Sequence, residues 1–179
     1  MIGQPVQRKL VKGTSQFYMR YNPKTVLPPV ASRYILSETH PIRPKIQHLY
    51  ANRDPSTLWW RVNPQPLQSF KRVVRSWATR RARLAFRQAL AAQGFDVEGR
   101  RLVSEASGSA AMRSPKESLQ GSLEIAVLPQ SVKMGYDTVR MEMDYLLRTL
   151  LRHLRDGEKQ TNTSRKRGQD HKTMPTNTS

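Results

Sequence analysis

Proline spacing sets the first limit on secondary structure in this chain. Nine of the twelve prolines lie in the first 66 residues, at positions 5, 23, 28, 29, 41, 44, 55, 64 and 66. Proline lacks the backbone N–H that helices and central strands need, and it disfavours helix in the residue before it. We therefore predict that residues 1–66 form a long, extended, basic and Pro-rich N-terminal arm. Residues 15–21 (SQFYMRY) and 32–36 (SRYIL) have strand-like composition, but each needs a neighbour to pair with.

A small α+β core is predicted at residues 67–155, in the order helix, strand, strand, helix. The first helix is expected from about Gln68 to Gln93, because Pro64 and Pro66 precede it and an amphipathic pattern follows. Ser69 is the expected cap, and Gly94 stands where a left-handed residue commonly ends a helix.

The two strands of this core are expected near Arg100–Ser104 and at residues 122–128. In the second, Leu123, Ile125 and Val127 alternate, which predicts a half-buried strand that pairs antiparallel with the first. Residues 105–118 are small and polar, with Gly and Pro, and predict a flexible loop.

The second helix is predicted from Tyr136 to Arg155, where apolar residues recur every three or four positions and Gly157 follows. From residue 156 to 179 the chain has almost no apolar side chains. A stretch of this composition cannot bury enough surface to fold alone, so we predict a disordered basic C-terminal tail.

The first helix carries cations on one side and small or apolar side chains on the other. Between Lys71 and Gln93 there are seven Lys or Arg residues and no Asp or Glu. A helical projection groups one set as an apolar arc: Phe70, Val73, Val74, Trp77, Ala78, Leu84, Ala85, Ala91 and Ala92. The alanines at 78, 82, 85, 89 and 92 predict a low strip for close packing, and the far side holds Arg72, Arg80, Arg83 and Arg87. Arg81 falls inside the apolar arc, so it must pair, reach solvent or meet a partner.

The overall charge points to a polyanionic partner. Lys and Arg number 31 against 13 Asp and Glu, which gives a formal net charge of +18. Such an excess favours binding to nucleic acid, and arginine can donate two hydrogen bonds to one phosphate. The predicted RNA-binding residues are Arg8, Lys9, Lys12, Arg20, Lys24, Arg33, Arg43, Lys45, Arg72, Arg75, Arg80, Arg83, Arg87, Arg165, Lys166 and Arg167.

Aromatic side chains lie among these cations and are candidates for stacking on bases. They are Tyr18, Tyr21, Trp59 and Trp60, and the combination of aromatic rings with cations is typical of single-strand binding. For Trp59 and Trp60 the alternative is structural, since aromatic residues just before a helix often cover a small core.

The sequence shows no catalytic or metal-binding set, and we expect no cofactor and no small-molecule substrate. There is no Cys, and the four His are not at ligand spacing. Asp137, Glu142 and Asp144 are interpreted as structural, because acids near a helix start complement its dipole and can pair with Arg140 or Arg148. We expect that the protein is not an enzyme, although catalysis on RNA is left open.

In overall build the chain resembles ribosomal proteins, in which basic extensions order on RNA. The resemblance rests on the acid-free stretch Met1–Ser37, on the arginines of the first helix and on the cluster Arg165, Lys166 and Arg167. It implies a structural rRNA-binding component of a ribosome, in a large ribonucleoprotein assembly with neighbouring proteins. The acid-poor N-terminus favours the mitochondrial ribosome and a matrix location, with a cytoplasmic or nuclear location as the alternative.

Two other classes remain open at this point. A peripheral subunit or assembly factor of a mitochondrial membrane complex would place cations on anionic lipid. It would show Trp, Phe and Leu opposite its cations, as Phe70, Trp77 and Leu84 partly do. A DNA-binding factor would need a recognition motif, and none is present. No apolar stretch is long enough to cross a membrane.

Overall fold

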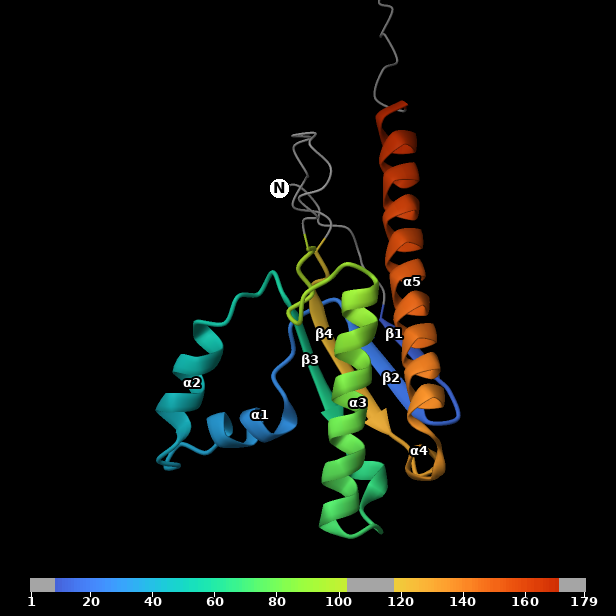
Figure 1. Cartoon of the computed structure of the whole chain (residues 1–179). Helices are drawn as coiled ribbons and strands as arrows, with labels where there is room; N and C mark the ends of the chain where they lie inside the picture. Colours follow the sequence, from blue (N-terminus) through green and yellow to red (C-terminus); the bar gives the residue numbers. More distant parts are fainter. Residues whose placement is uncertain (1–8, 103–117, 171–179) are drawn as a thin grey trace, which may run out of the picture.

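A four-stranded sheet packs against two long helices in the computed structural model, which describes residues 9–102 and 118–170, with side chains described as far as Asp156 (Figure 1). In chain order the elements are β1 (Leu10–Gly13), β2 (Phe17–Asn22), α1 (Pro29–Leu36), α2 (Arg43–Ala51), β3 (Leu58–Asn63), the 3-10 turn η1 (Gln65–Leu67), α3 (Arg72–Ala92), β4 (Gly121–Val127), α4 (Gln130–Lys133) and α5 (Tyr136–Asp170). The expected α+β class is confirmed.

The strands lie in the order β1-β2-β4-β3, so the sheet is mixed. β1 pairs antiparallel with β2, and β2 pairs antiparallel with β4. β3 and β4 are parallel neighbours, joined through α3. A parallel pair requires a crossover of this kind, because its connection must return to the same end of the sheet.

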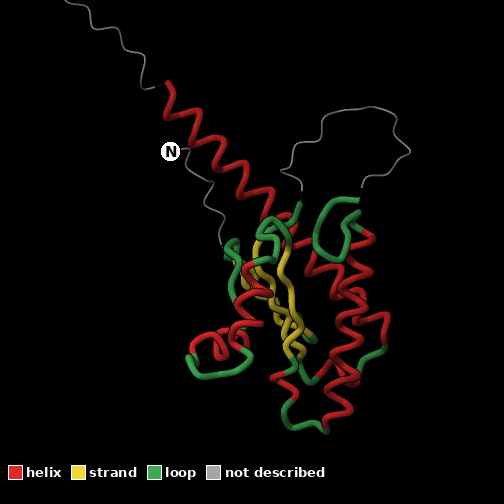
Figure 2. The backbone as a smooth tube through the Cα atoms, turned by 90° about the vertical axis from the view of Figure 1, so that its left-hand side faces the viewer, coloured by secondary structure: helices red, strands yellow, loops and turns green. Residues whose placement is uncertain are grey.

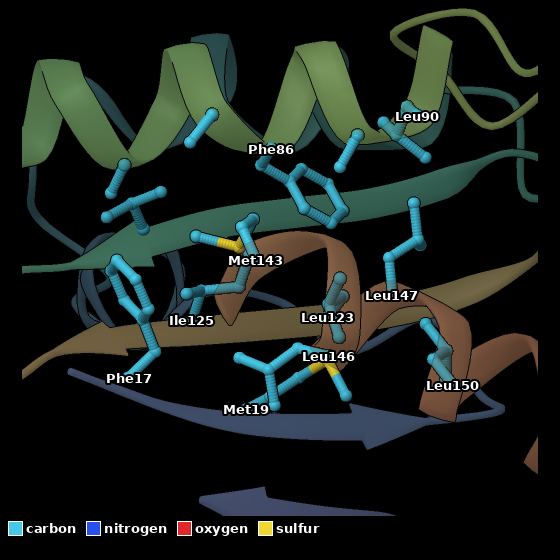
Figure 3. Close-up of a cluster of buried hydrophobic side chains, with 14 of the residues drawn as sticks. Phe17, Met19, Phe86, Leu90, Leu123, Ile125, Met143, Leu146, Leu147 and Leu150 are labelled. Atoms are coloured by element: carbon cyan, nitrogen blue, oxygen red, sulfur yellow. The ribbon is translucent and has the colours of Figure 1, made fainter. Parts of the chain in front are cut away.

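One face of the sheet is covered by α3 and α5, and the core lies between these layers (Figures 2 and 3). Side chains that alternate along β2 and β4 point into it, and all are fully buried: Phe17, Met19, Tyr21, Leu123, Ile125 and Val127. The helices supply Phe86 and Leu90 from α3 and Met143, Leu146, Leu147 and Leu150 from α5. Each such side chain stabilises the fold by roughly 1.5–3 kcal/mol, and the predicted alternation on β4 is confirmed.

Four alanines on α3, Ala78, Ala82, Ala85 and Ala89, form a strip of small side chains on its buried side. Their exposed fractions are between 0% and 4%. We call them the alanine strip. Small side chains let helix backbones and strands approach closely, and α3 packs against both α5 and the sheet. The predicted packing role of these alanines is therefore confirmed, except for Ala92, which is exposed.

The prediction of an extended arm is wrong for the described part of residues 1–66, which contains strands and helices. Three of the four strands and the helices α1 and α2 come from this stretch, and residues 1–8 lie outside the described residues. The prolines punctuate the elements rather than prevent them. Proline occupies one of the first two helical positions of α1, α2 and η1, where no backbone N–H is required. Residues 15–21 contain the predicted strand, whereas residues 32–36 belong to α1.

The prediction of a strand near Arg100–Ser104 is also wrong for the described part of that range. Arg101 forms an isolated β-bridge with Phe95 and belongs to no strand, and residues 103–117, which include most of the predicted loop, lie outside the described residues. The antiparallel partner of β4 is instead β2. The prediction could not include this pairing because the two strands are about a hundred residues apart in the sequence.

Helix ends differ from the predictions at two points and agree at one. α3 begins after Lys71, without a side-chain cap from Ser69. It ends before Gly94, whose φ of 77° is the predicted left-handed conformation. α5 does not end at Gly157 but continues to Asp170, so the part of the predicted disordered tail before residue 171 is helical. Residues 171–179 lie outside the described residues.

Gly121, at the start of β4, gives the first testable prediction. Its φ is 100°, and a Cβ there would collide with the carbonyl oxygen of Asn22 and approach that of Pro23 to 3.0 Å. We expect Gly121→Ala to lower the free energy of unfolding by about 3 kcal/mol. Gly94→Ala is the matched control, because Gly94 also has a positive φ but nothing lies within 4 Å of the position that the new methyl group would take; we expect about 1 kcal/mol. Urea denaturation of both variants checks this, and equal losses would contradict it.

Candidate nucleic-acid interface

The predicted arginines of α3 form one exposed face. Arg72, Arg80, Arg83 and Arg87 are all exposed, and we call them the arginine face. Among the side chains that the structure describes, the ion pairs are Arg61–Glu124, Arg100–Asp54 and Arg100–Glu98, so none involves α3. The positive charge of this face is thus not compensated by neighbouring carboxylates of the described chain.

The apolar arc predicted for α3 coincides only partly with the buried side of the helix, so this part of the prediction is wrong. Trp77, Leu84 and Val73 are exposed by 45%, 50% and 79%. The buried side consists of the alanine strip together with Phe86, Leu90 and Thr79. The projection was centred on Phe70, whereas the helix is rotated so that its alanines, with Phe86 and Leu90, face α5 and the sheet. Trp77 and Leu84 are therefore left on the surface beside the arginine face.

Arg81 lies between the buried side and the exposed side of α3. Its guanidinium donates to the carbonyl oxygens of Met134 at 2.9 Å and Ser131 at 3.4 Å. The same group stacks on the ring of Trp77 at 4.3 Å and lies 5.9 Å from the ring of Tyr136. The requirement that Arg81 must pair is thus met within the chain, since it satisfies carbonyl groups around the end of α4.

The other predicted RNA-binding residues are distributed over several parts of the chain and differ in exposure. Lys9, Arg20, Lys24, Arg33 and Lys45 are exposed but come from different elements. Lys12, Arg43 and Arg75 are half-buried, and the guanidinium Nε atoms of Arg43 and Arg75 are buried. Arg8 lies outside the described residues. The side chains of Arg165, Lys166 and Arg167, although on α5, are not described.

The four stacking candidates have different environments. The prediction that Tyr21 stacks on bases is wrong, because this side chain is buried. Its hydroxyl donates to the carbonyl of Gln120 at 2.8 Å, and burial raises its pKa to about 12. Trp60 packs against Phe86 and donates to the carbonyl of Val97 at 2.8 Å, as its structural interpretation predicts. Both residues are therefore unavailable for bases.

Tyr18 and Trp59 lie on the sheet face opposite α3. Tyr18 is 38% exposed, and its strand neighbour Arg20 is also exposed. Trp59 is half-buried, with Tyr50 at 5.7 Å and the guanidinium of Arg53 at 4.6 Å from its ring. The alternation of side chains along β2 is enough to predict that Tyr18 and Arg20 lie on the same face. The position of Trp59 on that face could be known only from the strand order of the sheet.

Among the acidic residues of α5, Glu142 links the helix to another part of the fold. Its carboxylate accepts hydrogen bonds from the Ser15 hydroxyl at 2.5 Å, from the backbone N–H of Gln16 at 3.1 Å and from the Gln16 side chain at 3.0 Å. It thereby joins α5 to the β1–β2 turn, a contact that the predicted pairing with Arg140 or Arg148 did not include. Among the described side chains, no group of three or more His, Asp and Glu could hold a metal ion.

Comparison with known proteins gives no match for this chain among protein-family models, curated proteins or solved structures. Within the described residues, no helix combines the length and the apolar composition that are needed to cross a lipid bilayer.

Glu142 gives a prediction of pH dependence. Burial raises the pKa of this carboxyl, but the hydrogen bonds from Ser15, Thr14 and Gln16 lower it more, so the pKa is below its ordinary value. A lowered folded-state pKa adds stability above the unfolded pKa of about 4.3, and that stability is lost as the pH falls through the folded value. We expect Glu142→Gln to cost roughly 1 kcal/mol at pH 7 and much less at about pH 3.

The measurement is urea denaturation across this pH range, with Asp144→Asn on the same helix as the control. A cost of Glu142→Gln that does not change with pH would contradict the assignment of the ionised carboxylate to the β1–β2 turn.

Proposed function

We propose that this protein is a structural RNA-binding protein, a component of the mitochondrial ribosome that neutralises rRNA phosphates and bridges neighbouring proteins. The observation that carries the proposal is the arginine face of α3. Its four guanidinium groups are exposed, and the helix contains no acidic residue that could neutralise them. In this role the protein performs no chemistry, and the acid-free stretch before Glu38 supports a matrix location.

The spacing of the arginine face suits a phosphate backbone. Arg80, Arg83 and Arg87 extend over about 10 Å of helix, since each residue adds 1.5 Å. Over that length they can reach more than one phosphate of a strand, and each guanidinium can donate two hydrogen bonds to a single phosphate. A solvated helix face usually mixes charges of both signs, which makes a bound polyanion the simplest explanation of this face. Tyr18 and Arg20 offer a second, smaller contact on the opposite face of the sheet.

A second candidate function is supported by the exposed apolar side chains of α3. Trp77 and Leu84 lie beside Arg80 on the surface, and helices that bind anionic lipid carry both exposed apolar side chains and cations, on opposite faces. This observation favours a peripheral subunit or assembly factor of a mitochondrial membrane complex. The cations are adjacent to the apolar residues rather than opposite them, so we place this candidate second.

Charge reversal on the arginine face tests the proposal. We expect the triple variant Arg80→Glu, Arg83→Glu and Arg87→Glu to weaken binding to an rRNA fragment at least tenfold and to reduce the slope of log affinity against log salt by about 2–3, since each lost phosphate contact removes 0.7–0.9. The fold should persist, because all three side chains are exposed. Gel shifts at several salt concentrations and circular dichroism measure the two effects.

The matched control reverses Arg140, Arg148 and Arg152, which are exposed on α5 and give the same change in net charge. If both triple variants lose RNA binding equally, only net charge matters and the assignment to α3 is wrong. Flotation with cardiolipin-containing vesicles separates the second candidate. Tight vesicle binding by a protein that does not bind RNA at low salt would favour the membrane-associated function.

A further inference from the structure

An apolar hollow lies on the surface between α3 and the start of α5. It has a volume of about 490 Å³ and is lined by Trp77, Arg81, Leu84, Met134, Gly135 and Tyr136. Three of these side chains are large, apolar and substantially exposed: Trp77 by 45%, Leu84 by 50% and Met134 by 43%. The hollow is shallow and open to solvent, and exposed apolar side chains gathered in one place are typical of a protein-binding surface.

The walls of this apolar hollow are held in place before any partner arrives. Arg81 joins α3 to the α4–α5 connection through Met134, and its guanidinium supports the ring of Trp77. Tyr136 is fixed from the other side, because its hydroxyl donates to the side chain of Gln88 at 2.8 Å. A site whose side chains are already ordered loses less entropy on binding.

The chemistry of the lining selects apolar side chains as the group that enters. A nucleobase carries hydrogen-bonding edges, and burying them without partners costs free energy. Two N–H groups of Arg81 are engaged with carbonyl groups, and the Tyr136 hydroxyl donates to Gln88, so only part of the polar capacity of the lining is left for a base. Leucine or phenylalanine side chains have no such requirement, and Met134 offers a flexible surface against which they can pack.

The rim of the apolar hollow selects the charge of the partner. Lys133 and Asp137 flank the lining residues in sequence, Arg80 lies between Trp77 and Leu84, and Arg140 follows one turn after Tyr136; all four are exposed. The guanidinium of Arg81 lies 5.9 Å from the ring of Tyr136. Four cations, counting Arg81, therefore stand against one acid, and this favours a partner with carboxylates around its apolar residues.

We propose that this hollow is the docking site for an acidic segment of a neighbouring protein, which inserts apolar side chains between Trp77, Leu84 and Met134 while its carboxylates meet Arg80, Lys133 and Arg140. The site adjoins the arginine face and shares Arg80 with it, but none of the residues that line the hollow belongs to that face, and the proposal does not depend on RNA binding. It assigns a role to the exposed Trp77 and Leu84 that phosphate binding leaves unexplained.

The experiment uses the full chain and a fluorescein-labelled synthetic peptide in which Leu recurs at helical spacing among Glu and Asp. Fluorescence anisotropy should show binding of this peptide. A peptide with Ala in place of Leu and a peptide with Lys in place of the acids should both bind at least tenfold more weakly. Equal binding of the Leu and Ala peptides would overturn the proposal, because charge alone would then explain the interaction.

Leu84→Glu and Val73→Glu form the matched pair of variants. Both replace an exposed apolar residue of α3 with the same charge, but only Leu84 lines the apolar hollow. We expect Leu84→Glu to weaken peptide binding at least tenfold and Val73→Glu by less than about twofold, since an exposed charge outside the site is largely screened. Similar losses for both variants would overturn the proposal. If circular dichroism shows that Leu84→Glu is unfolded, Leu84→Ala and Val73→Ala replace the pair, and the same difference is required.

The uncharged pair Leu84→Ala and Val73→Ala distinguishes the other occupants, because it leaves the charge of the arginine face unchanged. An rRNA fragment and cardiolipin-containing vesicles should bind Leu84→Ala and Val73→Ala equally. If either ligand binds Leu84→Ala much more weakly than Val73→Ala while the peptide does not, the hollow takes nucleic acid or lipid and the inference is wrong. Loss of RNA binding on charge reversal of the arginine face would leave this result unchanged, so the two proposals can fail separately.

Discussion

Close packing of α3 through its alanine strip is the interaction on which the rest of this structure depends. Methyl side chains at Ala78, Ala82, Ala85 and Ala89 allow the helix to lie against both α5 and the sheet. Larger side chains at these positions would force the layers apart, because protein interiors are packed without spare volume. The orientation of α3 about its axis follows from this contact.

That orientation determines which chemistry reaches the surface. With the alanine strip turned inward, the arginine face is turned outward, and so are Trp77 and Leu84. One helix thus presents a row of guanidinium groups beside an apolar hollow. Arg81 lies between the arginine face and the apolar hollow. Its guanidinium donates hydrogen bonds to the carbonyl groups of Ser131 and Met134 and stacks on the Trp77 ring. The two contacts proposed above, one with a polyanion and one with a neighbouring protein, would therefore lie side by side on this surface.

Local patterns in the sequence were good guides to single elements. The alternation of Leu123, Ile125 and Val127 correctly predicted β4 and its buried face, and Gly94 correctly marked the end of α3. The prolines were misleading in the first 66 residues, because their number was taken as evidence against structure. Several of them occupy the first turn of a helix, where their conformation is already suitable.

The sequence by itself determined the charge of this protein, the exposure of the arginine face and the class of its two long helices, because these depend on composition and on the spacing of nearby residues. Only the tertiary structure decided the sheet order, the inward rotation of the alanine strip and the attachment of Glu142 to the β1–β2 turn. Each of these depends on residues far apart in the chain. The apolar hollow belongs to the same group, since Leu84 and Met134 meet only when α3 packs against the start of α5. No local sequence pattern predicts this site, because Leu84 and Met134 are each exposed residues in segments that are far apart in the sequence.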